Sequence, residues 1–242
     1  MTTSNISYSI NEFLSKFSDL TKEEEKEIIE IISYYYEVKG DNKEFYPYQV
    51  WDCCLLSNLE DSLLDTILSK FQLPSTIKYE EGEKIAEFFN YKVKEYDVRG
   101  LKQVLGTCYK DHKLILIQPD LDEDNKLNTY RHELIHAHQF SSFFISLIWR
   151  DRETYVESME RNLHRSLTPE EKLSLLVSWE KVKDSKGVKK DYAYEAPAYL
   201  LSDNDLNWSL FMEIYRMERF CKENKFNYLQ FEEWLLSEKK QI

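Results

Sequence analysis

The sequence predicts a mostly helical α+β fold, with helical N- and C-terminal segments and a small β-sheet between them. Three observations indicate this class. The 242 residues include only five glycines and five prolines, so helix breakers are few. Helix-start patterns recur along the chain, whereas strand-like runs are confined to residues 91–118. We expect a helical N-terminal region over 1–90 and a region over 91–242 that holds the sheet, in one compact unit.

Capping boxes start the helices of the N-terminal region. Thr21 and Glu24 form one such pair ahead of an isoleucine-rich helix, and Ser57 and Glu60 form a second ahead of a leucine-rich helix. A further short helix is expected over 83–89. This region is most simply a helical packing layer.

Three short strands are expected next. The stretches YKVKEYDV (91–98), LKQVLGTCY (101–109) and KLILIQ (113–118) are separated by turn-forming residues. Residues 114–117 are apolar at every position, which indicates a strand that is buried on both faces.

Helix is expected again after the acidic loop DLDEDNKLN, from Thr129 onward. Thr168 to Glu171 form the start of one helix, and the lysine- and glycine-rich stretch 184–190 ends it. Two further helices are expected, over 206–222 and from Asn227 to the end.

Charge and composition exclude several classes of function. The formal net charge is −12 and the lysines are interleaved with acids, so a nucleic-acid partner is not expected. No apolar run is long enough to span a membrane, so we expect a soluble protein without a membrane partner. The N-terminal residues do not form a secretory signal, and the four cysteines show neither disulfide nor zinc spacing. An intracellular protein fits, as does a leaderless secreted effector that acts inside a cell.

The stretch NTYRHELIHAHQF, residues 128–140, holds three of the five histidines. On a helix of about 100° per residue, His132 and His136 share one face, and an apolar stripe lies opposite. Side chains at i and i+4 lie one above the other, so both imidazoles can bind one Zn²⁺. Glu133 lies alongside them and can take a proton from a water molecule that the metal activates. His138 falls away from the pair, so we expect it to be exposed or to lie behind the ligands.

The HELIH motif resembles that of the zincin metallopeptidases. The resemblance covers the strand near 113–118, the helix near 129–145 and one later helix, under a third of the chain. It implies a zincin-like fold in which the small sheet packs against the HExxH helix. In that family, an edge strand before the helix pairs with extended peptide substrate, and KLILIQ is the matching segment.

A catalytic zinc site has three protein ligands and one open position, so a third ligand is needed. The metzincin subclass is excluded, because Gln139 and Ser142 occupy the positions of its conserved glycine and histidine. The aspartate-ligand subclass is also excluded, because the only glycine after Gly106 is Gly187, in an unsuitable context. The gluzincins, which take a glutamate from a downstream helix, are left.

The resemblance to gluzincins offers two main candidates for the third ligand. Glu195 lies 59 residues beyond His136 in an E-x-x-A arrangement, and small neighbouring residues would let its helix approach closely. Pro197 would suit the first turn of that helix. Glu157 lies 21 residues beyond His136, a thermolysin-like spacing, but in a charged stretch. We prefer Glu195 and keep Glu157 as the alternative. The remaining candidates are Glu153, Glu160 and His164.

Two further residues have expected roles near the metal. Tyr199 lies one turn after Glu195 and can donate a hydrogen bond to a developing oxyanion. Gln139 lies on the face of the two histidines and can hydrogen-bond a ligand or a substrate.

The function predicted from this resemblance is that of a zinc-dependent metallopeptidase, specifically a metalloendopeptidase, acting on a protein or peptide substrate. Zn²⁺ would be held by His132, His136 and Glu195, with Glu133 as general base. The alternative is a catalytically silent zincin-like domain that binds a partner protein, although retention of Glu133 argues against it. A third hypothesis is a helical adaptor without metal. Only the acidic surface and the helix-rich termini support it.

Overall fold

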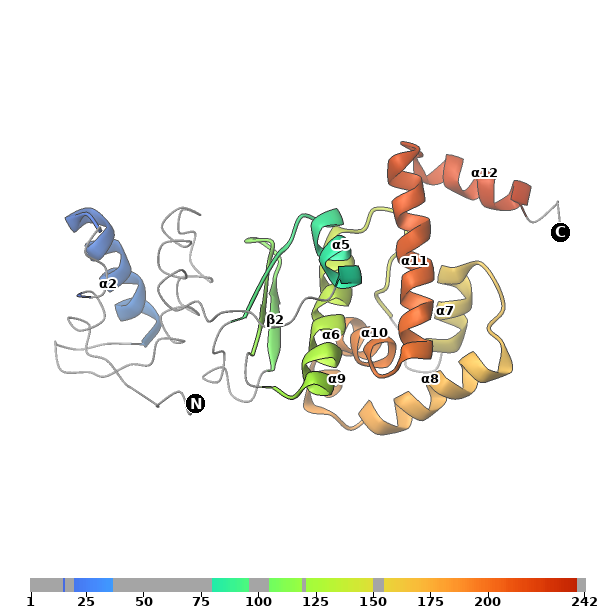
Figure 1. The fold of residues 1–242 in the computed structure, drawn as a ribbon, viewed down its shortest axis with the longest axis horizontal. Coiled ribbons are helices and arrows are strands. Elements are labelled where there is room, and N and C mark those ends of the chain that lie inside the picture. The colour runs from blue at the N-terminus through green and yellow to red at the C-terminus, as the bar shows by residue number, and fades with distance from the viewer. Residues whose placement is uncertain are drawn as a thin grey trace. The chain divides into compact units, whose positions relative to one another are not determined.

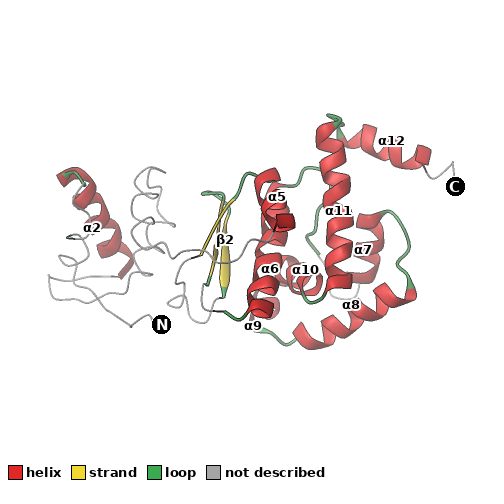
Figure 2. Cartoon of the chain, viewed as in Figure 1, coloured by secondary structure: helices red, strands yellow, loops and turns green. Residues whose placement is uncertain are grey.

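The computed structural model describes residues 15, 20–36, 80–95, 105–118, 121–149 and 155–238. The chain divides into two compact units, which are Met1–Ile77 with Val93–Leu121, and Lys78–Lys92 with Asp122–Ile242. Helices dominate the described residues beside one small sheet, as the sequence predicts (Figure 2).

In the first unit, helix α2 (Lys22–Tyr36) begins at the predicted capping box. The amide of Glu24 donates to the Thr21 hydroxyl at 3.2 Å, and the amide of Thr21 donates to the Glu24 carboxylate at 2.7 Å. The second predicted box, at Ser57, lies outside the described residues.

The sheet has three strands, β1 (Lys92–Glu95), β2 (Gly106–Tyr109) and β3 (Leu114–Ile117), in the order β1-β3-β2. Strands β2 and β3 are antiparallel. All four residues of β3 are buried, as their apolar pattern predicts. The expectation that β3 is an edge strand that pairs with substrate is wrong. Strand β3 is central, hydrogen-bonded to β1 on one side and to β2 on the other, so it does not present an open sheet edge. Packing of this sheet against the histidine helix stays a prediction.

The second unit is helical. Its elements are α5 (Glu80–Phe88), α6 (Glu123–Ser141), α7 (Tyr155–Leu163), α8 (Pro169–Val182), α9 (Lys186–Lys190), α10 (Tyr192–Ser202), α11 (Asp205–Glu223) and α12 (Tyr228–Glu238). Helix α10 packs against α6, α8, α9 and α11 (Figure 1). Its small and aliphatic residues Ala196, Ala198, Leu200 and Leu201 are fully buried. Helix α10 is therefore the centre of this unit.

The histidine helix α6 is displaced from its expected bounds. It begins at Glu123, six residues before the predicted start, because the Asp122 carboxylate accepts from the Asn125 amide at 2.9 Å and caps it. The acidic stretch expected as a loop thus forms the first turns. The helix ends at Ser141, and Ser142 has extended backbone angles. The chain is non-helical over 142–149, where the sequence analysis expected helix.

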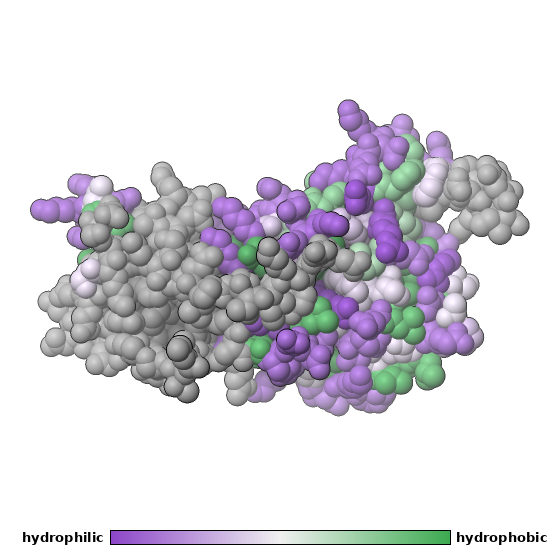
Figure 3. Space-filling view, viewed as in Figure 1, coloured by the Kyte–Doolittle hydropathy of each residue, from purple (hydrophilic) through white to green (hydrophobic). Residues whose placement is uncertain are grey.

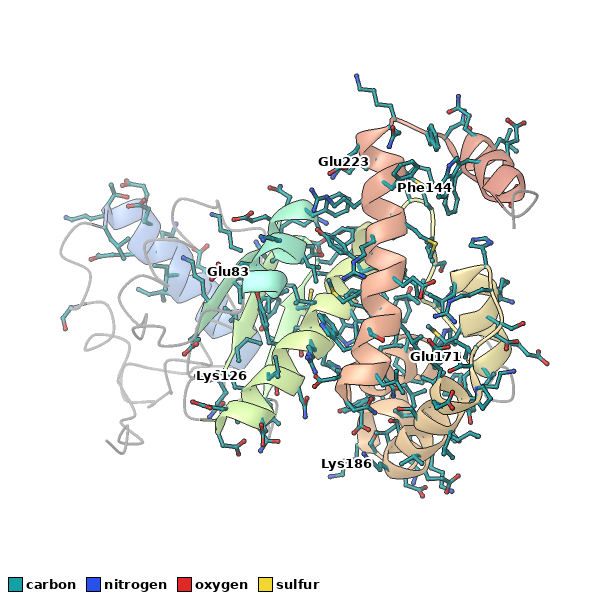
Figure 4. The ribbon with its side chains drawn as sticks, turned by 45° about the vertical axis from the view of Figure 1, so that its right-hand side comes forward. Glu83, Lys126, Phe144, Glu171, Lys186 and Glu223 are labelled. Atoms are coloured by element: carbon teal, nitrogen blue, oxygen red, sulfur yellow. The ribbon has the colours of Figure 1, made fainter. Side chains whose placement is uncertain are left out.

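Of two other helix starts, one agrees with the sequence analysis and one does not. Helix α8 begins where the sequence predicts, and Thr168 and Glu171 form a capping box there. The stretch 184–190, expected as a break, contains the short helix α9, because the Ser185 hydroxyl accepts from the Val188 amide and starts a new turn. Arg165, before α8, donates to Glu171 of α8 and to Glu213 of α11, and so ties these helices together. Glu171 is labelled in Figure 4.

Helix α5 packs on α6 through a glycine. A Cβ atom at Gly82 would lie 2.1 Å from Cε1 of Tyr130, so any side chain there would collide with α6. This contact places α5 with the C-terminal helices, in the unit that joins Lys78–Lys92 to Asp122–Ile242. The expected division into regions at residue 90 stays a prediction.

Glu218 of α11 holds the extended segment that follows α6. Its carboxylate accepts from the Ser142 hydroxyl at 2.9 Å and from the Phe143 amide at 3.1 Å. Burial raises the pKa of Glu218, although these hydrogen bonds oppose the shift. The next residue, Phe144, is labelled in Figure 4, and its ring packs against Phe231 of α12.

The raised pKa of Glu218 has a consequence for stability. The folded protein binds a proton on the Glu218 carboxyl group more tightly than the unfolded chain does. The stabilisation that results is complete below the unfolded pKa and is lost as the pH rises through the folded pKa. Glu218→Gln does not titrate. We expect the free energy of unfolding of the wild type, minus that of the variant, to fall as the pH rises above about 4, the usual pKa of a glutamate, in urea titrations. A difference in the free energy of unfolding that rises with pH would show that the pKa of Glu218 is not raised.

No helix in the described part of the chain is long and apolar enough to cross a membrane. Apolar residues do reach the surface among polar ones (Figure 3). Those on α8 are Leu173, Leu176 and Val177.

Candidate metal centre

Three of the predicted ligand residues converge on one point. The Nε2 atoms of His132 and His136 lie 3.0 Å apart. Oε2 of Glu195 lies 3.4 Å from Nε2 of His132, and Oε1 of Glu195 lies 3.6 Å from Nε2 of His136. One ligand atom from each residue lies within 4.8 Å of the others. Glu195 reaches the histidines because α10 packs directly on α6.

These separations fit a shared metal ion. Ligand atoms about 2.0–2.2 Å from a tetrahedral metal lie roughly 3.3–3.6 Å from one another. Both nitrogen–oxygen distances fall in or near that range, and the nitrogen–nitrogen distance is slightly shorter. Two imidazoles and one carboxylate also form a donor set that suits a divalent transition metal and leaves a coordination position open.

The charges of the three groups suit cation binding. Burial, together with the nearby charge of His132, lowers the pKa of His136 to about 4, although Glu195 and the bond to Gln139 oppose the shift. Burial alone would raise the pKa of Glu195, but its bond to His132 and the charges of His132, His136 and Lys190 lower it overall. At neutral pH, His136 thus has a free lone pair and Glu195 is a carboxylate, which are the states that bind metal.

Glu133 lies beside the ligands and is almost entirely buried, with 5% of its surface exposed. Burial raises its pKa to about 7; the charge of His132 opposes the shift and that of Glu195 adds to it. A carboxylate with a pKa near neutrality can both take up and release a proton at neutral pH.

Tyr199 lies on the same side of α10 as Glu195. Its ring centroid is 4.5 Å from that of His132, in an edge-on contact. Burial raises the pKa of Tyr199, and the charges of Glu195 and Glu133 add to the shift, so the phenol keeps its proton and is a hydrogen-bond donor.

Helix α9 approaches this site through Gly187, which the sequence analysis set aside. A Cβ atom there would lie 3.0 Å from Cε2 of Tyr199 and 3.1 Å from Oε2 of Glu195. The lack of a side chain is what lets α9 pack against both residues. A lone glycine inside a lysine-rich helix was the available sign of such an approach.

Pro197 lies inside α10 rather than in its first turn, because the helix begins at Tyr192. Proline has no N–H, so the carbonyl of Ala193, four residues earlier, loses its usual helical partner. That carbonyl accepts instead from the backbone amide of Trp149, at 3.0 Å. The extended segment after α6 is thereby joined to the turn that carries Glu195.

The alternative third ligands that lie within the described residues do not reach the histidines. Among the described residues, the group of ligand atoms that includes His132 and His136 does not contain Glu157, which is exposed on α7. Glu160 is bonded to Lys172 and to the Leu167 amide. His164 is likewise not in the group, and its ring packs against Phe231. Glu153 lies outside the described residues.

His138 is fully buried, which excludes the first of its two expected placements, an exposed position. Its ring packs edge-on against Phe89 and Phe211, from outside α6. Helix α6 is covered on several sides, whereas the sequence pattern indicated one apolar stripe.

Comparisons with known protein families, with curated proteins and with solved structures found no match.

Proposed function

We propose that the protein is a zinc-dependent metallopeptidase of gluzincin-like type, with protein or peptide substrates. The observation that carries the proposal is the convergence of His132, His136 and Glu195, with the buried Glu133 beside them. The HExxH spacing alone occurs in unrelated helices, whereas a carboxylate from a distant helix within 3.6 Å of both imidazoles is a specific arrangement.

A bound Zn²⁺ would supply a Lewis acid that polarises the scissile carbonyl and makes a water molecule more acidic. Glu133 would accept a proton from that water molecule as the water oxygen attacks the carbonyl carbon. The same carboxyl group would then give the proton to the amide nitrogen as the C–N bond breaks, which yields a carboxylic acid and an amine. Its raised pKa suits both transfers.

Tyr199 would assist at the carbonyl oxygen of the substrate. Its protonated phenol would donate a hydrogen bond to the carbonyl oxygen as negative charge develops there. The edge-on contact with His132 would hold the ring in place.

Metal analysis and peptide hydrolysis test the proposal together. The purified protein should bind one zinc per chain, and it should cleave members of a peptide library. His132→Ala should lose both properties, since it removes one of the three ligands. Zinc content that is unchanged in this variant would disprove the metal centre. Full zinc content without cleavage of any peptide would instead favour the catalytically silent, protein-binding alternative.

A further inference from the structure

Gln139 connects one proposed metal ligand to two backbone segments. It follows His136 by one turn on α6, and its side chain is buried. Its Oε1 atom lies 2.7 Å from Nδ1 of His136. Its Nε2 group donates to the carbonyl of Leu147 at 3.0 Å and to that of Tyr194 at 2.9 Å.

These contacts fix which end of the amide faces the histidine. A carbonyl oxygen can only accept hydrogen bonds, so both backbone partners require the NH₂ end of Gln139. The oxygen end must then face His136, and an oxygen acceptor requires a proton on Nδ1. In a neutral imidazole, a proton on Nδ1 leaves Nε2 without one.

We infer that Gln139 is a positioning residue that holds His136 in the Nδ1-protonated tautomer, with its bare Nε2 facing Nε2 of His132 and, slightly farther away, the Glu195 carboxylate. Protein groups alone fix the tautomer of His136, before a metal binds. Its effect on metal affinity rests on the proposed function, whereas the tautomer itself does not.

The device draws on both helices of the site. Tyr194 immediately precedes Glu195 on α10, so the Gln139 amide also bonds the turn that carries the carboxylate ligand. Leu147 belongs to the extended segment whose Trp149 amide is bonded to Ala193. One side chain thus orients a histidine on α6 and anchors the backbone next to the glutamate on α10.

The tautomer can be measured without metal. Nitrogen-15 NMR of histidine-labelled, metal-free protein at about pH 7.5 should show His136 with its proton on Nδ1. Gln139→Met removes both the acceptor and the donors, so that preference should be lost, and zinc affinity from chelator competition should fall roughly 10–100-fold. Gln139→Glu keeps an acceptor for Nδ1 and loses the donors, so the tautomer should persist while thermal stability falls.

Asn162→Leu is the matched control. The buried Asn162 amide donates to the carbonyl of Ser146 in the same extended segment, without reaching either histidine. This variant should leave the tautomer and the zinc affinity unchanged. A wild-type His136 protonated on Nε2, or an unchanged tautomer in Gln139→Met, would overturn the inference. A tautomer that changes as expected in a protein that binds no zinc would uphold the role of Gln139 and reject the proposed function.

Discussion

Glu133→Gln should bind zinc and fold as the wild type does, while peptide hydrolysis falls by roughly three orders of magnitude or more. Glutamine has nearly the same shape, so it fills the same buried position. It cannot take a proton from water, and Glu195, the other carboxylate that the described residues bring to this site, is the proposed metal ligand. The loss should appear in kcat with little change in KM, since the base acts only in the chemical step.

Glu123→Gln, in the exposed first turn of the same helix, makes the same chemical change away from the ligands and should leave hydrolysis unchanged. Turnover by Glu133→Gln within a few-fold of the wild type would show that this residue is not the base.

Glu195→Ala should lose both zinc and hydrolysis, because it removes the only carboxylate that reaches the two histidines among the described residues. The loss of zinc affinity should exceed the roughly 10–100-fold loss that follows removal of a residue that hydrogen-bonds a ligand. Ala196 and Ala198 already pack with small side chains, so the fold should tolerate one more alanine in this turn. Chelator competition and metal analysis measure the affinity.

Glu157→Ala is the matched substitution at the thermolysin-like spacing. Because Glu157 is exposed on α7, its replacement should have a small effect on zinc and on activity. If Glu157→Ala loses its metal and Glu195→Ala retains it, the ligand assignment is wrong.

The features that the sequence predicted well depend on residues close together in the chain. The juxtaposition of His132 and His136 follows from helical geometry, and the capping boxes of α2 and α8 follow from contacts three residues apart. Glu195 is a long-range contact, but its small neighbours indicated that its helix could pack closely.

The features that were missed depend on which other elements cover a segment. A helical pattern gives the faces of α6 but does not say that aromatic rings from elsewhere enclose His138. The central position of β3 depends on its pairing with β1, which lies earlier in the chain. The residues of β3 do not encode that pairing. The orientation of Gln139 requires carbonyl groups from two distant segments.

Pro197 makes the order of α10 conditional on the rest of the unit. An interior proline leaves a helix with an unmatched carbonyl and costs about 3 kcal/mol in an isolated helix. Here the carbonyl of Ala193 is satisfied only when the Trp149 amide is in place. The two segments should therefore open and close as one cooperative unit, so a local fluctuation that releases residues 145–149 would also release the turn carrying Glu195. The carboxylate would then be ordered only in molecules whose tertiary packing is complete.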